Sequence, residues 1–167
     1  VVERPKILST DTSPELDAWK HAIEHCNANY GEFDNFISLP PTSPLRSELD
    51  INNAIKHLDK TCADICISIC RSIRSPYFNM VKIDDESRNS VSLLANQGEM
   101  VFRRQDGPKI FDITTVIYAA KPNYILSTDS ILKGDAVAIE VPRERSIDID
   151  DIIDFQIAEH LLKNMHD

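Results

Sequence analysis

The chain has 167 residues, of which 42% are hydrophobic and 27% charged, the composition of one soluble globular domain with a real core. Its formal net charge is −9, from 18 basic and 27 acidic residues, which excludes nonspecific nucleic-acid binding because such binding requires a basic face. No apolar run approaches the length of a membrane span, and no signal peptide is visible.

The first elements predicted along the chain are a helix and a buried strand. Ser13 and Pro14 are typical of a helix start, with a capping hydroxyl and a proline in the first turn, and apolar residues then recur at helical spacing to about Asn27. Residues 35–39 predict a strand that ends at a proline pair. A polar loop after such a strand is where open α/β sheets bind ligands, so this loop is a candidate binding segment. The alternative is a proline-rich turn that only leads into the next helix.

A second helix is predicted over residues 48–58, with Ser47 as its cap. Its expected buried side consists of Leu49, Ile51, Ala54, Ile55 and Leu58. Residues 63–69 predict another strand. Two β-like runs, 77–83 and 90–95, follow with a polar segment between them, which indicates a hairpin or meander inserted into the scaffold.

The last part of the chain alternates strands and helices. Strands are predicted over 114–120 and 136–141, with a short helix or turn over 122–131 between them, and a final helix runs from Asp151 to about Met165. The expected buried side of the final helix consists of Ile152, Phe155, Ile157, Ala158, Leu161 and Leu162. Strands alternating with helices predict an α/β fold of three layers, a mostly parallel sheet covered on both faces.

Three of the four cysteines, Cys62, Cys66 and Cys70, recur at every fourth residue, and the other is Cys26. On a helix this spacing would stack three thiols on one face, which makes a zinc site one interpretation. However, the surrounding residues are β-rich and no CxxC pair occurs. In a strand the three thiols would share one face with neighbours such as Ser68. We therefore expect core or interface packing rather than a metal site or disulfides.

The acidic segment after residues 135–141 is the most informative stretch of the chain. Asp148 and Asp150 lie two residues apart, so an extended backbone would place both carboxylates on one face, close enough to share one hard cation. The alternative is an acidic loop that caps the next helix, with Asp150 or Asp151 as N-cap.

Three motifs occur in a fixed order: 39–46 (LPPTSPLR), 102–108 (FRRQDGP) and 145–150 (RSIDID). In this order and at these separations, they make the chain resemble the acylneuraminate cytidylyltransferases, the family of CMP-sialic acid synthetases. The resemblance runs from about Arg4 to Leu162. It implies a sheet of the nucleotide-diphospho-sugar transferase type with a small β-rich dimerisation lobe at about 71–100.

The resemblance also implies the reaction, in which CTP and a free nonulosonic (sialic-type) acid give the CMP-activated sugar and pyrophosphate. Asp148 and Asp150 would hold the Mg²⁺ cofactor. Arg104 and Gln105 would be the catalytic pair that engages the sugar acid. Further substrate contacts would come from Thr42, Ser43, Arg46 and Arg103. The alternative for the two arginines is a surface pair that balances an acidic chain. The expected partners are CTP, an acidic nine-carbon sugar and a second copy of the chain.

The chain departs from the family at three places. The glycine-rich basic loop that cradles the CTP phosphates has no counterpart among only 4 scattered glycines, so we expect the C-terminal part of a longer enzyme, inactive alone. Pro40 replaces a glutamine that contacts the sugar, and residues 112–115 (DITT) replace the family's Asn-Gly-Ala. The substrate is therefore expected to be another nonulosonic acid, of legionaminic or pseudaminic type, or an acid sugar outside that set.

Two other functions compete with this one. A noncatalytic interaction module would keep the fold and dimerise without binding nucleotide or metal. A cytidylyltransferase for the eight-carbon sugar of bacterial lipopolysaccharide would share the sheet, but the segment 103–105 speaks against it. Neither nucleic acid nor a membrane is an expected partner, and the cytoplasm is the expected compartment.

Overall fold

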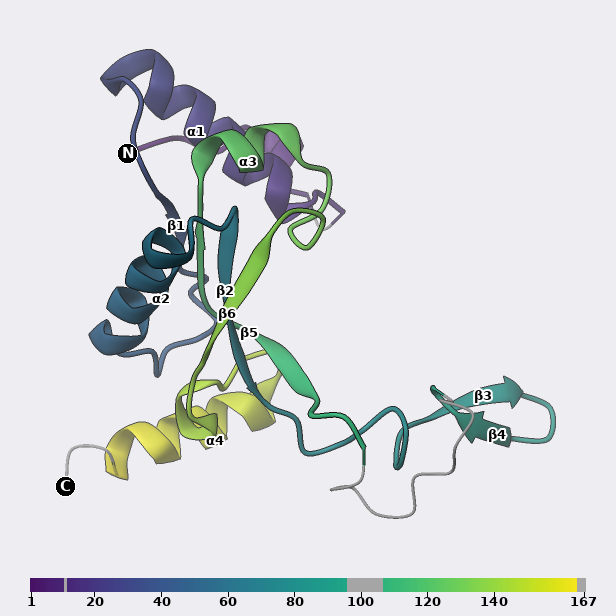
Figure 1. The fold of residues 1–167 in the computed structure, drawn as a ribbon. Coiled ribbons are helices and arrows are strands. Elements are labelled where there is room, and N and C mark those ends of the chain that lie inside the picture. Colours follow the sequence, from purple (N-terminus) through teal and green to yellow (C-terminus); the bar gives the residue numbers. More distant parts are fainter. Residues whose placement is uncertain (11, 96–106, 165–167) are drawn as a thin grey trace. The chain divides into compact units, whose positions relative to one another are not determined.

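The computed structural model describes residues 1–10, 12–95 and 107–164 (Figure 1). The chain divides into two compact units. The larger unit comprises Val1–Ile69 and Ile113–Asp167, and the smaller unit comprises Cys70–Asp112, a range that contains the whole segment 71–100 predicted as an insertion.

The larger unit is built on a sheet whose described strands follow the order β1–β5–β2–β6. These strands are β1 (Phe36–Ser38), β2 (Ile65–Arg71), β5 (Phe111–Ala120) and β6 (Ala136–Glu140). β1 is antiparallel to β5, and β2 is parallel to β6. The Lys121 amide donates to the Asp64 carbonyl, and the Ile117 amide donates to the Ser68 hydroxyl. Positions that rise along β5 therefore meet positions that fall along β2, so these two strands run in opposite directions. β1, β2 and β6 therefore share one direction, and the predicted α/β class is confirmed.

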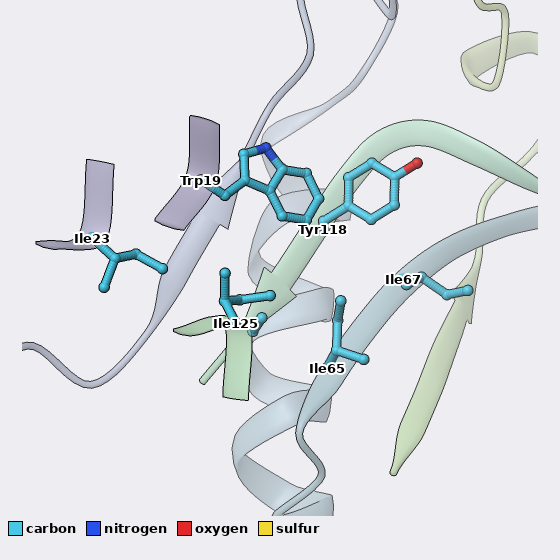
Figure 2. Close-up of a cluster of buried hydrophobic side chains, with 7 residues drawn as sticks. Trp19, Ile23, Ile65, Ile67, Tyr118 and Ile125 are labelled. Carbon is cyan, nitrogen blue, oxygen red and sulfur yellow. The ribbon is translucent and has the colours of Figure 1, made fainter. Parts of the chain in front are cut away.

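A cluster of buried apolar side chains joins one face of this sheet to α1 (Glu15–Tyr30) and α3 (Pro122–Ser127) (Figure 2). Alternation along β2 directs Ile65 and Ile67 to this face. The other members of the cluster are Trp19, Ile23, Tyr118, Ala120 and Ile125. Burial of each large apolar side chain stabilises the fold by about 1.5–3 kcal/mol relative to leaving it exposed. Away from this cluster, α2 (Glu48–Thr61) lies against β6.

The first helix begins differently from its prediction. Pro14 is the residue before α1, and no side chain caps the helix. The Ser13 hydroxyl instead donates to the Ile7 carbonyl (2.9 Å) and lies 2.7 Å from the Thr10 hydroxyl. The prediction of Ser13 as a cap is therefore wrong, because a loop just before the helix uses that hydroxyl.

The second helix confirms its predicted cap but not its predicted buried side. The Ser47 hydroxyl accepts from the Asp50 amide, and the Asp50 carboxylate accepts from the Ser47 amide, a reciprocal capping box. Ala54 and Leu58 are buried as predicted, but Leu49 is exposed and Asp50 is buried in its place. The helix is therefore rotated so that a carboxylate, not a leucine, faces the interior at its first turn.

The last helix, α4 (Ile152–Asn164), contradicts the prediction of an apolar buried side. Of the six residues predicted to be buried, only Ala158 is; Phe155 is 50% exposed. Apolar residues occur on several sides of this helix, so periodicity alone did not identify the face that packs. Within the described residues, no helix has the length and apolar character needed to cross a membrane.

The cysteines are free and differ in burial. Cys66 and Cys70 lie on β2 and are buried, as a packing role predicts, whereas Cys62 is exposed at the end of α2. Burial raises the pKa of the Cys66 thiol to about 11.

The smaller unit contains the predicted hairpin, formed by the antiparallel strands β3 (Val81–Asp85) and β4 (Ser90–Leu93). Val81 pairs with Leu93 and Ile83 with Val91, so the four apolar side chains share one face. All four are exposed in the single chain. A two-stranded ribbon with an exposed apolar face is marginal in water by itself.

Candidate functional site

The loop after β1 carries the first motif and is held in shape by Arg46. The Arg46 Nε donates to the carbonyl of Ser43 (3.0 Å), and its Nη2 donates to the carbonyl of Pro40. The guanidinium thus ties both ends of the turn that contains Thr42. Its predicted role in substrate binding stays a prediction beside this structural one.

Hydroxyl groups connect the same loop to the sheet. The buried Ser43 Oγ lies 2.6 Å from the Thr115 Oγ1 on β5, and the Thr114 Oγ1 donates to the Ser68 Oγ on β2 (2.8 Å). Thr114 and Thr115 belong to the stretch at which the chain departs from the family that it resembles. The hydroxyls of Thr114 and Thr115 therefore connect the loop and the two strands by hydrogen bonds. Ser43 itself is buried and not open to a ligand.

The third motif contacts the first motif at one point and the first turn of α2 at another. The Ile149 amide donates to the Thr42 carbonyl at 2.9 Å. Arg145, in the 3-10 turn Arg143–Arg145, donates through Nε and Nη2 to both carboxylate oxygens of Asp50, at 2.9 and 2.8 Å. Two segments predicted to share a site are therefore in contact.

Asp50 is the buried acid of this contact, with 3% of its surface exposed. Burial by itself raises the pKa of Asp50. Hydrogen bonds from Arg145 and Ser47, together with the Arg145 charge, outweigh it and hold the pKa below its ordinary value. The carboxylate is therefore ionised at neutral pH and paired with Arg145.

The carboxylates of the acidic segment have different surroundings. Asp151 caps α4, because its Oδ1 accepts from the amides of Ile153 (2.7 Å) and Asp154 (3.0 Å). Asp148 and Asp150 take no part in this cap. Asp150 is exposed and has no side-chain hydrogen bond or ion pair to any described residue. The capping alternative weighed from the sequence thus applies to Asp151, and it leaves Asp148 and Asp150 available.

The carboxylates of Asp148 and Asp150 are oxygen donors of the kind that Mg²⁺ takes. The Oδ1 of Asp148 is buried and has no hydrogen-bond partner among the described residues, which is costly for a carboxylate oxygen unless a cation or water bonds to it. The described part of the chain contains no group of three or more His, Cys, Asp or Glu side chains that could hold a metal. Mg²⁺ is usually held by one or two carboxylates, with waters and substrate phosphates completing its octahedron.

Tyr118 adds a phenol to this neighbourhood. Its ring packs on Trp19, with centroids 5.2 Å apart, and its oxygen points away from the apolar cluster (Figure 2). Burial raises the pKa of Tyr118, and the nearby carboxylates of Glu15 and Asp148 raise it further. The phenol is therefore a neutral hydrogen-bonding group close to Asp148.

The structure thus brings together Thr42, Ser43, Arg46 and the acidic segment, while Arg103, Arg104 and Gln105 lie outside the described residues. Sequence reasoning missed Asp50 and Tyr118. A signal for Asp50 existed, since Ser47 and an acid three residues later form a capping box. Nothing in the sequence marked Tyr118 apart from other strand residues.

No protein-family model matches the chain. The flagellin modification protein B of Campylobacter coli is 26% identical and is covered over 67% of its length by 96% of this chain. The CMP-N,N'-diacetyllegionaminic acid synthase of Campylobacter jejuni is 30% identical, with 98% of this chain covering 68% of it. The chain therefore spans about two thirds of the length of these relatives.

Two further proteins are more distant in length or in sequence. The N-acylneuraminate cytidylyltransferase of Escherichia coli is 29% identical, and 93% of this chain covers 35% of it. Among solved structures, a CMP:2-keto-3-deoxy-manno-octonic acid synthetase complexed with CTP superimposes with a TM-score of 0.58 at 14% identity, over 93% of this chain and 70% of that one. At that identity the likeness shows the fold alone.

Proposed function

Because the chain belongs to the acylneuraminate cytidylyltransferase family, we propose that it contributes the site at which CTP is joined to a nonulosonic acid. An anomeric hydroxyl oxygen of the sugar acid bonds to the α-phosphorus of CTP. The bond from that phosphorus to the oxygen bridging to the β-phosphate breaks, and pyrophosphate leaves while the hydroxyl proton is released. The products are the CMP-sugar and pyrophosphate.

One observation carries this proposal: the hydrogen bond from the Ile149 amide to the Thr42 carbonyl. It joins the loop after β1 to the segment that bears Asp148 and Asp150, two motifs more than a hundred positions apart. Loops that follow strands at one edge of an α/β sheet are where such folds bind ligands. The unpartnered oxygen of Asp148 adds a group that a divalent cation would satisfy.

The proposed roles follow from the chemistry of each side chain. Asp148 and Asp150 hold Mg²⁺, which when bound neutralises phosphate charge. Arg104, with Gln105, engages the carboxylate of the sugar acid, since a guanidinium can bond both carboxylate oxygens, and Arg103 is the alternative to Arg104. Thr42, through its hydroxyl, contacts the sugar or nucleotide. Phosphoryl and nucleotidyl transfer depend mainly on positioning and charge neutralisation, so no nucleophilic side chain is required.

The proposed sugar substrate is a nonulosonic acid of legionaminic type. Its reaction with CTP is proposed to take place in the cytoplasm. Two features support this sugar: Pro40 in place of the family's glutamine, and the 30% identity with the CMP-N,N'-diacetyllegionaminic acid synthase. The 167 residues supply no glycine-rich basic loop for the CTP phosphates. We therefore propose that the 167-residue chain turns over its substrates slowly unless further residues provide such a loop.

Pyrophosphate release tests this proposal. It is measured with CTP, Mg²⁺ and a panel of legionaminic, pseudaminic, sialic and eight-carbon acid sugars, for the 167-residue chain and for the product of its complete gene. We expect Mg²⁺-dependent release with a legionaminic acid from the gene product, and release at least about a hundredfold slower from the chain alone. Release with only the eight-carbon sugar, or with none of the panel, would contradict the proposal; the latter with self-association intact would favour the noncatalytic interaction module.

We also propose that the smaller unit forms a dimer contact through the apolar face of its β3–β4 hairpin. Val81, Ile83, Val91 and Leu93 form that face and are exposed in the single chain. A contiguous exposed apolar face is typical of an interaction surface, and the hairpin needs such packing to be stable. A second copy of the chain is the occupant that the family resemblance implies.

Ile83→Glu is expected to convert a dimer into a monomer, because it places an unpaired carboxylate in the centre of the apolar face. Light scattering after gel filtration measures the mass. Lys82→Glu is the matched control, since Lys82 pairs with Ser92 on the opposite face of the same strand. Loss of the dimer in both variants, or in neither, would contradict the assignment of this face.

A further inference from the structure

The ion pair between Asp50 and Arg145 connects the third motif to the first turn of α2, which follows the first motif, inside the larger unit. Both Arg145 donors bond, one to each oxygen of the carboxylate, and the residues are 95 positions apart in the chain. The side chain of Asp50 is 4% exposed and that of Arg145 is 20% exposed. A bidentate contact of this kind fixes the direction of the guanidinium as well as its position.

Asp50 is itself immobilised by the start of α2. Its Oδ2 accepts from the Ser47 amide at 2.9 Å and from the Ser47 hydroxyl at 2.8 Å. Ser47 follows Arg46, whose guanidinium ties the loop after β1 to its own carbonyls. Arg145 is therefore attached to a rigid point, the first turn of a capped helix, and not to a mobile side chain.

The acidic segment, residues 145–151, is bonded to the rest of the larger unit at two points. Arg145 fixes its beginning to Asp50, and the Ile149 amide fixes its middle to the Thr42 carbonyl. Residues 146–149 between the turn and α4 form neither helix nor strand, so regular backbone pairing does not set their path. Asp148 lies between the two attachments, and Asp150 lies just beyond the second.

We propose that Arg145 and Asp50 are positioning residues that orient Asp148 and Asp150 for a divalent cation. The proposal rests on the proposed function and adds a role for two residues to which that function assigns none. A buried ion pair contributes little net stability compared with apolar residues of the same volume, so a purely stabilising role explains this pair poorly. Groups that orient metal ligands from outside the coordination sphere commonly change metal affinity when they are removed.

Mn²⁺ binding in the presence of CTP, followed by electron paramagnetic resonance, tests the proposal in four variants of the chain. Asp50→Asn keeps an oxygen acceptor for the Ser47 amide but removes the charge. Arg145→Met removes the guanidinium, and Arg145→Lys keeps the charge without the two-pronged geometry. Arg143→Met is the matched control, because Arg143 lies in the same turn, is exposed, and makes no side-chain hydrogen bond or ion pair with the described residues.

We expect Mn²⁺ affinity to fall roughly tenfold in Asp50→Asn and Arg145→Met, less in Arg145→Lys, and not at all in Arg143→Met. Hydrogen exchange of the Ile149 amide, measured by NMR on the same samples, is expected to accelerate in the same order. This second readout reports the position of the acidic segment without any metal.

A lowered unfolding midpoint with unchanged Mn²⁺ affinity and unchanged Ile149 exchange would overturn the proposal, because it would leave the pair a structural role only. Failure of the unaltered chain to bind Mn²⁺ would contradict the proposed function instead. In that case unchanged exchange of the Ile149 amide in Arg145→Lys, the variant least prone to unfold, would by itself overturn the positioning role.

Discussion

Asp148→Ala and Asp150→Ala are each expected to weaken Mn²⁺ binding in the presence of CTP by at least about a hundredfold, the upper end of losses for residues outside the coordination sphere. The reason is the small number of protein ligands: with two carboxylates, loss of either removes half of the protein's charge at the ion. Isothermal titration with CTP held in excess measures the affinity.

The stability of Asp148→Ala distinguishes a ligand from a structural carboxylate. The buried Asp148 Oδ1 has no hydrogen-bond partner among residues 1–10, 12–95 and 107–164, so its removal is expected to leave the free energy of unfolding unchanged or raise it. Urea denaturation measures this quantity. A stability loss above about 1 kcal/mol would instead place Asp148 in the framework of the fold.

Asp151→Asn is the control for the overall negative charge of the acidic segment. Asparagine caps helices as well as aspartate does, so α4 keeps its start while the segment loses one negative charge. We expect unchanged Mn²⁺ affinity in this variant. An equal loss in Asp151→Asn and Asp148→Ala would mean that the ion responds to the overall charge of the segment and not to specific ligands.

Trp19→Ala is expected to lower the free energy of unfolding by about 3–5 kcal/mol, the largest stability effect in the larger unit. The indole packs against Phe36 and Tyr118, with ring centroids 5.5 and 5.2 Å away, and its Nε1 donates to Glu15. It thereby joins α1 to both β1 and β5. Chemical denaturation measures the loss, which corresponds to a fall in melting temperature of roughly 10 °C for a domain of this size.

Glu24→Ala controls for the helix itself, because Glu24 is exposed on α1. Its effect on unfolding is expected to stay within about 0.5 kcal/mol. If Trp19→Ala cost no more than this control, the cluster drawn in Figure 2 would not be the main core of the larger unit.

The order of elements was predictable from the sequence because each depends on local pattern. The alternation of isoleucine along β2 and the capping serine of α2 specify their elements within a few residues. The rotation of a helix about its own axis was not predictable in the same way. Leu49 and Asp50 occupy adjacent positions, and the choice between them depends on Arg145, 95 residues beyond Asp50. A distant charge thus buried an acid where the hydrophobic pattern predicted a leucine.

The candidate site shows the same limit. The acidic motif was recognisable as a metal site or a helix cap, and sequence reasoning could not divide its carboxylates between the two. The structure assigns the cap to Asp151 through its bonds to the Ile153 and Asp154 amides. Tyr118 was unpredictable for a different reason: its proximity to Glu15 and Asp148 depends on the packing of a helix and a loop over β5.

The long separation between Asp50 and Arg145 has a consequence for biosynthesis. At about 5–20 residues per second, a ribosome adds the 95 residues from Ile51 to Arg145 in roughly 5–20 s. Throughout that interval the start of α2 carries an acid whose partner does not yet exist, and closing so long a loop has an entropic cost that short contacts avoid. The two motifs can meet only when synthesis of the larger unit is nearly finished, so nascent chains shorter than this cannot assemble the site.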